Sequence, residues 1–151
     1  MMNTKLHKEY DKDFYAWTMH NAQLLRQGKL SEIDIENVAE EIESMGKSDK
    51  WQLINRLAVL IAHLLKWQCQ PERRGNSWLA IIKEQRLRVK RLLGESPSLK
   101  HELSLKLADA YELAVLKAMK ETNLPEKSFV KDCPFTLDQC LRDNFFPKNK
   151  E

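Results

Sequence analysis

The sequence predicts an all-α fold, a single compact bundle of about five major helices plus a short C-terminal helix. Apolar residues recur with the helical period of 3.6 residues, and no stretch of strand length alternates with period two. Only 4 Gly and 5 Pro occur in 151 residues, too few for the turns of a many-stranded sheet. Hydrophobic residues make up 42% and charged residues 31%, the balance of a folded chain rather than a disordered one.

Two helices are expected in the first third of the chain. The first runs from about Asp13 to Gln27 and stops at Gly28. The second begins with Asp34 as its N-cap, and Gly46 ends or bends it. The residues expected on their buried faces are Phe14, Trp17, Leu24 and Leu25 in the first helix and Ile35, Val38, Ala39, Ile42 and Met45 in the second.

The third helix, about residues 48–70 and stopped by Pro71, is expected at the centre of the bundle. Its apolar residues cover well over half of the helical circumference, so neighbours must surround it. A narrow polar stripe is left over, formed by Gln52, Asn55, Arg56, Val59, His63, Lys66 and Gln70.

Three further helices complete the prediction. A fourth begins at Asn76 or Ser77 and ends at Gly94, and a long fifth opens at Ser96-Pro97 and reaches about Glu121. A short last helix starts at Thr136, with Gln139 three residues on as a capping box, and Pro147 ends it. No linker interrupts the chain, which indicates one domain over residues 1–151 with a core of about residues 10–147.

Composition limits the classes of site. The longest apolar run, Leu57 to Ala62, is far shorter than the ~18 residues of a membrane helix, and the charged N-terminus lacks the apolar segment of a signal peptide. We therefore expect a cytoplasmic protein with no membrane partner. Cys69, Cys133 and Cys140 match no disulfide framework and no metal spacing, so they are interpreted as reduced thiols.

Charge is uneven along the chain although the net charge is only +3. Residues 32–49 hold seven acids and one base, a balance of 1 − 7 = −6, whereas residues 73–91 hold seven bases and one acid, 7 − 1 = +6. One interpretation is that the two charged helix faces attract each other within the fold or across a dimer. The other is that the basic segment binds an anionic ligand such as a nucleic-acid backbone.

Several blocks of sequence together carry a resemblance to a known family, and they are Asp13–Trp17, Glu40–Gly46, His63–Trp67, Gln70–Arg74, Ser77-Trp78, Arg86, Ser96–Leu99 and Cys133-Pro134. These blocks resemble a bacterial family known as domain of unknown function 29. The resemblance extends from about Tyr10 to Pro147 and implies a compact, mostly helical bacterial domain. It implies no activity.

Arg56 and His63 are the candidate catalytic residues. They lie seven residues apart, which places them within ~20° on one helix face and about 10 Å apart along the axis. The pair resembles the R-x4-6-H motif of the HEPN superfamily, helical domains that include metal-independent ribonucleases working as dimers. In that hypothesis His63 moves the proton of a ribose hydroxyl and Arg56 stabilises the charge on the phosphate. The competing interpretation is a stripe that hydrogen-bonds to neighbouring helices.

The RNA hypothesis assigns further basic residues to the nucleic-acid backbone. They are Lys66, Arg73, Arg74, Lys83, Arg86 and Lys90. No metal or cofactor is expected, because Glu40, Glu41 and Glu43 form no Glu-x-x-His spacing with any histidine. The alternative function, from another class, is a non-catalytic interaction or assembly module that pairs its acidic and basic helices with itself or with another protein.

Overall fold

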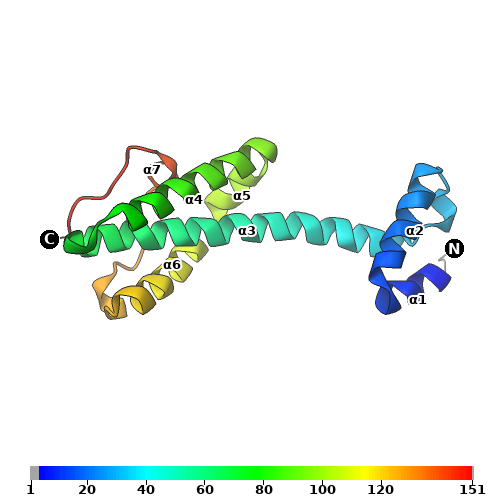
Figure 1. Ribbon diagram of the computed structural model, residues 1–151, viewed down its shortest axis with the longest axis horizontal. Helices are drawn as coiled ribbons and strands as arrows, with labels where there is room; N and C mark the ends of the chain where they lie inside the picture. The colour runs from blue at the N-terminus through cyan, green and yellow to red at the C-terminus, as the bar shows by residue number, and fades with distance from the viewer. Residues whose placement is uncertain (1–3, 151) are drawn as a thin grey trace. The chain divides into compact units, whose positions relative to one another are not determined.

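A computed structural model describes residues 4–150, and over this range the all-α fold class is confirmed (Figure 1). The described chain contains no strand. Its α-helices are α1 (Thr4–Lys12), α2 (Phe14–Arg26), α3 (Ile35–Cys69), α4 (Asn76–Glu95), α5 (Leu99–Leu105), α6 (Leu107–Thr122) and α7 (Leu137–Leu141). Short 3-10 turns occur at η1 (Leu30–Glu32), η2 (Pro71–Arg73) and η3 (Glu126–Ser128).

The chain divides into two compact units, residues 1–48 and 49–151. The first unit holds α1, α2 and the first part of α3, and the second holds the rest. Each unit is described by itself. The expectation of one domain stays a prediction.

The first unit is held by a small core. Asp13 caps α2 by accepting a hydrogen bond from the Ala16 N–H at 3.1 Å, and Gly28 follows the helix at φ +71°, a conformation that favours glycine. Among residues 4–48, the buried apolar side chains are Leu6, Trp17 and Ile33. A unit of this size with so few buried apolar groups leaves much of its apolar surface in solvent.

The second unit is built around the C-terminal part of α3. Nearly every residue from Leu53 to Leu65 is buried there, as the broad apolar face of the sequence predicts. Small buried residues of α6 belong to this core, and α7 begins with the expected capping box of Thr136 and Gln139. The residues that close the core from other elements are Ile82, Val89, Ala110, Ala114, Ala118, Phe129, Phe135 and Cys140.

Several predicted helix boundaries are wrong, and the last helix ends at Leu141 instead of continuing to Pro147. The expected second and third helices are one helix, because α3 continues through Gly46. Glycine costs an interior helical turn only about 1 kcal/mol, which longer helices tolerate. The expected fifth helix is two, α5 and α6, separated at Lys106. The Ser104 hydroxyl donates to the Lys100 carbonyl at 3.0 Å, a bond that competes with the helical ladder and bends helices.

Several predicted core positions are also wrong. In α3, Ile35, Ile42 and Met45 are 61%, 64% and 68% exposed, so the first unit itself does not cover this face. Phe14 and Leu25 are exposed as well, whereas Trp17 is buried as expected. Periodicity identified the apolar face of each helix but not whether a neighbour covers it.

Candidate functional site

His63 is almost enclosed on α3. Its side chain is 6% exposed, and its Nδ1–H donates to the Val59 carbonyl at 2.9 Å. Burial lowers the pKa of His63 below its usual range, and the nearby Lys66 ammonium lowers it further, against the raising effect of the Val59 bond. The ring is therefore neutral near pH 7, with Nε2 left as an acceptor.

Arg56 lies two turns earlier on the same stripe and is half-buried. Its Nη1 donates a long bond of 3.4 Å to Gln85 Oε1 on α4. Its Nε is buried without a hydrogen-bond partner among the described residues. Arg56 therefore faces α4, as expected if the polar stripe hydrogen-bonds to neighbouring helices.

Lys66 is also engaged inside the second unit. Its ammonium donates to Glu121 Oε2 of α6 at 2.7 Å and lies 4.7 Å from the centre of the Trp78 ring. Only 7% of the residue is exposed. Lys66 therefore joins α3, α4 and α6, and its charge is already partnered.

Arg74 and Arg86 hold the end of the chain. Arg74 donates from Nε to the Trp67 carbonyl at 2.7 Å and from Nη2 to Asn149 Oδ1 at 2.6 Å. Arg86 is fully buried, and its guanidinium donates to the carbonyls of the C-terminal segment. These bonds reach the carbonyl oxygens of Cys140 at 2.8 Å, Asp143 at 3.2 Å, Gln139 at 3.4 Å and Phe145 at 2.7 Å.

The remaining basic candidates are exposed. Arg73 and Lys83 face solvent, and Lys90 forms an exposed ion pair with Asp143 at 2.7 Å. The predicted backbone-binding residues therefore separate into two groups. Lys66, Arg74 and Arg86 stabilise the fold, while Arg73, Lys83 and Lys90 lie where a partner can reach them.

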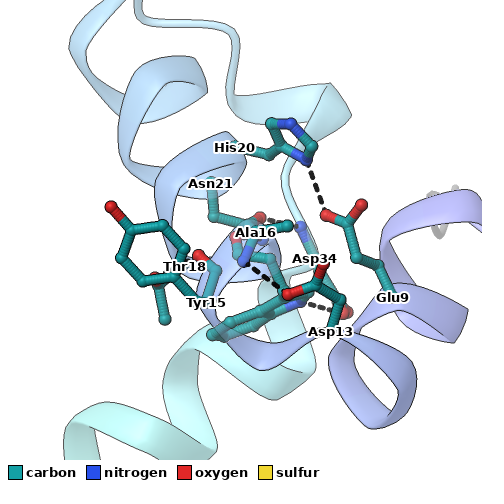
Figure 2. A network of polar contacts seen from close by, with 9 residues as sticks. Glu9, Asp13, Tyr15, Ala16, Thr18, His20, Asn21 and Asp34 are labelled. Atoms are coloured by element: carbon teal, nitrogen blue, oxygen red, sulfur yellow. Dashed lines mark hydrogen bonds and ion pairs between the residues drawn. The ribbon is translucent and has the colours of Figure 1, made fainter.

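A buried polar network in the first unit was missed by sequence reasoning (Figure 2). The Trp17 indole N–H donates to Asp34 Oδ2 at 2.9 Å, and the Asp34 backbone N–H donates to Asn21 Oδ1 at 2.9 Å. Burial raises the pKa of Asp34, but the hydrogen bonds from Asn37 and Trp17 outweigh it and leave the pKa lowered. The network fixes the start of α3 against α2, and the only sequence signal for it was the capping preference of Asp34.

The comparison with protein families decides the relationship. Residues 9–146 match the model of the family described as Domain of unknown function DUF29. This chain belongs to the DUF29 family. Comparisons with curated proteins and with solved structures gave no match.

The DUF29 chain has an apolar row in its first unit, in which Ile35, Ile42 and Met45 are exposed and Val38 is half-buried. Ile35, Val38, Ile42 and Met45 follow one another at spacings of three, four and three residues, the pattern that packs against a partner helix. Glu36 and Glu43 lie beside this row and face solvent. We call these six residues the α3 row.

An exposed basic face lies on α4 of the same DUF29 chain, in the second unit. Lys83, Leu87 and Arg91 are spaced by four residues, so they share one side of the helix, and all three are exposed. We call these three residues the α4 basic face. It presents one apolar side chain between two cations.

Over residues 4–150, no three His, Cys, Asp or Glu side chains cluster as metal ligands would. None of the described helices has both the length and the apolar character that crossing a bilayer requires.

Proposed function

We propose that this protein is a non-catalytic assembly module in which the α3 row of one copy binds the α4 basic face of another copy. The observation that carries the proposal is the exposure of Ile35, Ile42 and Met45 in a helical row flanked by acids. Contiguous exposed apolar side chains with polar rims are typical of interaction surfaces.

The first unit favours a partner on this row. Its own buried apolar set, among the described residues, is limited to Leu6, Trp17 and Ile33. Small units of this kind commonly gain stability by association. The heptad-like spacing suits a helical partner, since successive apolar residues then meet the same face of the second helix.

Charge selects the partner. A second α3 row would bring Glu36 and Glu43 against identical acids, which is unfavourable. The α4 basic face offers Lys83 and Arg91 to these acids and Leu87 to the apolar row. Because every copy carries both surfaces, binding is head to tail and produces closed rings or longer assemblies.

Charge reversal in two separate variants tests this pairing. The first variant carries Glu36→Lys and Glu43→Lys, and the second carries Lys83→Glu and Arg91→Glu. Each variant alone has two surfaces of like charge, so each is expected to stay a monomer of about 17.8 kDa by light scattering, while the wild type assembles. Mixing the two variants restores opposite charges at the contacts and should restore assembly.

The control pair is Arg88→Glu with Lys127→Glu, which changes exposed charges outside the two surfaces. Circular dichroism and thermal unfolding check that every variant is folded. Assembly by the second variant alone would indicate an α3-to-α3 dimer and overturn the proposal. A wild-type protein that remains monomeric at high concentration would overturn it as well.

The ribonuclease hypothesis receives little support from the position of His63. A general acid or base works best with a pKa near the operating pH and with access to substrate, whereas this ring is 6% exposed with a lowered pKa. Incubation of the wild type and His63→Ala with total cellular RNA in EDTA tests it. We expect no cleavage that depends on His63, and cleavage by the wild type alone would establish the nuclease instead.

A further inference from the structure

A pocket of about 650 Å³ lies in the second unit, between α4, α5 and α7. Its volume falls within the range of roughly 300 to 1,000 Å³ that holds small-molecule ligands. It shares no residue with the α3 row or with the α4 basic face. The proposed assembly therefore leaves the pocket without an assigned role.

The floor of the pocket is apolar. Leu93 of α4 and Leu137 and Leu141 of α7 line it, and all three are half-buried side chains packed on the outside of the core. Gly94 also lines it, and no atom would lie within 4 Å of a Cβ added there, so the wall is open at this point. An aliphatic chain can replace water on these three leucines.

The rim of the pocket is cationic. Lys90, Lys100 and Arg142 line it together with one acid, Asp138, which gives a local balance of 3 − 1 = +2. Lys90 is paired with Asp143 at 2.7 Å, and Arg142 is paired with Asp138. Both pairs are exposed, and exposed pairs exchange partners at little cost.

Lys100 is the cation that is available without any exchange. It is exposed, and no side-chain hydrogen bond or ion pair engages its ammonium among residues 4–150. Ser104, one turn later on α5, lines the same wall, with its hydroxyl proton donated to the Lys100 carbonyl at 3.0 Å. An anionic group at this position therefore meets the unpartnered Lys100 ammonium.

We propose that this pocket binds a small amphiphile with one anionic head on an aliphatic chain, the head lying at Lys100 and the chain on the three leucines. A carboxylate and a phosphate monoester both satisfy this chemistry. A neutral or cationic head does not.

Titration calorimetry of the full chain tests the proposal with four ligands, three of them below their critical micelle concentrations and decanol below its solubility limit. They are decanoate, decyl phosphate, decanol and decyltrimethylammonium. We expect the two anions to bind and the other two to bind at least tenfold more weakly, with the tighter anion identifying the head. Shortening decanoate to octanoate should weaken binding roughly tenfold, because two methylenes leave the apolar floor.

Lys100→Met should weaken decanoate binding at least fivefold, whereas the matched exposed substitution Lys127→Met should leave it unchanged. Decanoate should also shift the backbone amide resonances of Gly94 and Ser104, which report on the pocket directly. Equal binding of decanol and decanoate, or equal binding by the two lysine variants, would overturn the proposal. So would the absence of binding by both anions at millimolar concentration.

Discussion

Arg86 holds the C-terminal segment to α4 through a single buried guanidinium. Its donors reach four backbone carbonyls between Gln139 and Phe145, and the guanidinium carbon lies 5.3 Å from the centre of the Phe146 ring. Burial lowers the pKa of Arg86, while the Asp143 carboxylate raises it. A segment with little helix of its own thus receives four of its backbone hydrogen bonds from one side chain.

Arg86→Ala is expected to lower the free energy of unfolding by about 3 kcal/mol or more, since it leaves buried carbonyls without donors. Arg86→Lys should recover only part of this loss, because one ammonium cannot replace a planar fork. Urea unfolding provides the measurement. The matched control Arg88→Ala removes an exposed arginine of α4 and should change stability by less than about 0.5 kcal/mol.

His63 contributes a dependence of stability on pH. Its pKa in the folded protein is lowered from 6.5, so the unfolded chain binds the proton more readily. The stabilising contribution of neutral His63 is fully present above pH 6.5, the pKa in the unfolded chain. It is lost as the pH falls from there through the lowered pKa of the folded protein. We expect the wild type to lose more thermal stability between pH 7.5 and pH 5 than His63→Asn, whose amide still reaches Val59. Equal losses in the two proteins would show that His63 titrates normally.

The sequence could not predict which residues of the polar stripe are accessible to solvent. Arg56, His63 and Lys66 share a face by spacing alone, and that placement on α3 needs no further information. Whether the face meets solvent depends on α4 and α6, which come from distant parts of the sequence and bring Gln85 and Glu121 against it. Burial then determines the pKa of His63 and its access to solvent. Neither property can be derived from the spacing of the residues.

At the scale of elements, α3 departs most from the expected pattern. Its continuation through Gly46 makes one helix of two predicted ones, and a Cβ at Gly46 would meet nothing within 4 Å. The start of α7 was predicted correctly because the Thr136 box is a strong local signal, whereas α4 starts near the predicted residue with Gly75 as its N-cap and no side-chain cap bond. The break between α5 and α6 has no Gly or Pro to mark it.

Gly46→Ala tests the continuity of α3. If the residue is helical, alanine should raise the free energy of unfolding by about 0.5 to 1 kcal/mol and increase the helical signal at 222 nm. Gly28→Ala is the matched control, since its φ of +71° makes any side chain strained and should destabilise by about 1 kcal/mol. A loss of stability in Gly46→Ala would indicate that the helix is interrupted there.

At the scale of the whole molecule, the fold class could be predicted because the helical period of apolar residues is visible within each segment of the sequence. The uneven charge was equally visible, with acids gathered in residues 32–49 and bases in residues 73–91. The structure adds which of these charges are exposed. Glu36, Glu43, Lys83 and Arg91 are exposed, whereas Arg74 and Arg86 are engaged with the C-terminal segment.

The salt concentration distinguishes the two modes of self-association, because they respond to it in opposite directions. Head-to-tail binding brings opposite charges together, so raising NaCl from about 0.05 M to about 1 M should shorten the screening length to ~3 Å and lower the average mass toward 17.8 kDa. A symmetric dimer of α3 rows brings acids together and should gain mass with salt. Sedimentation at several salt concentrations measures this, and the variant Ile42→Lys, which places a charge in the apolar row, should remain monomeric throughout.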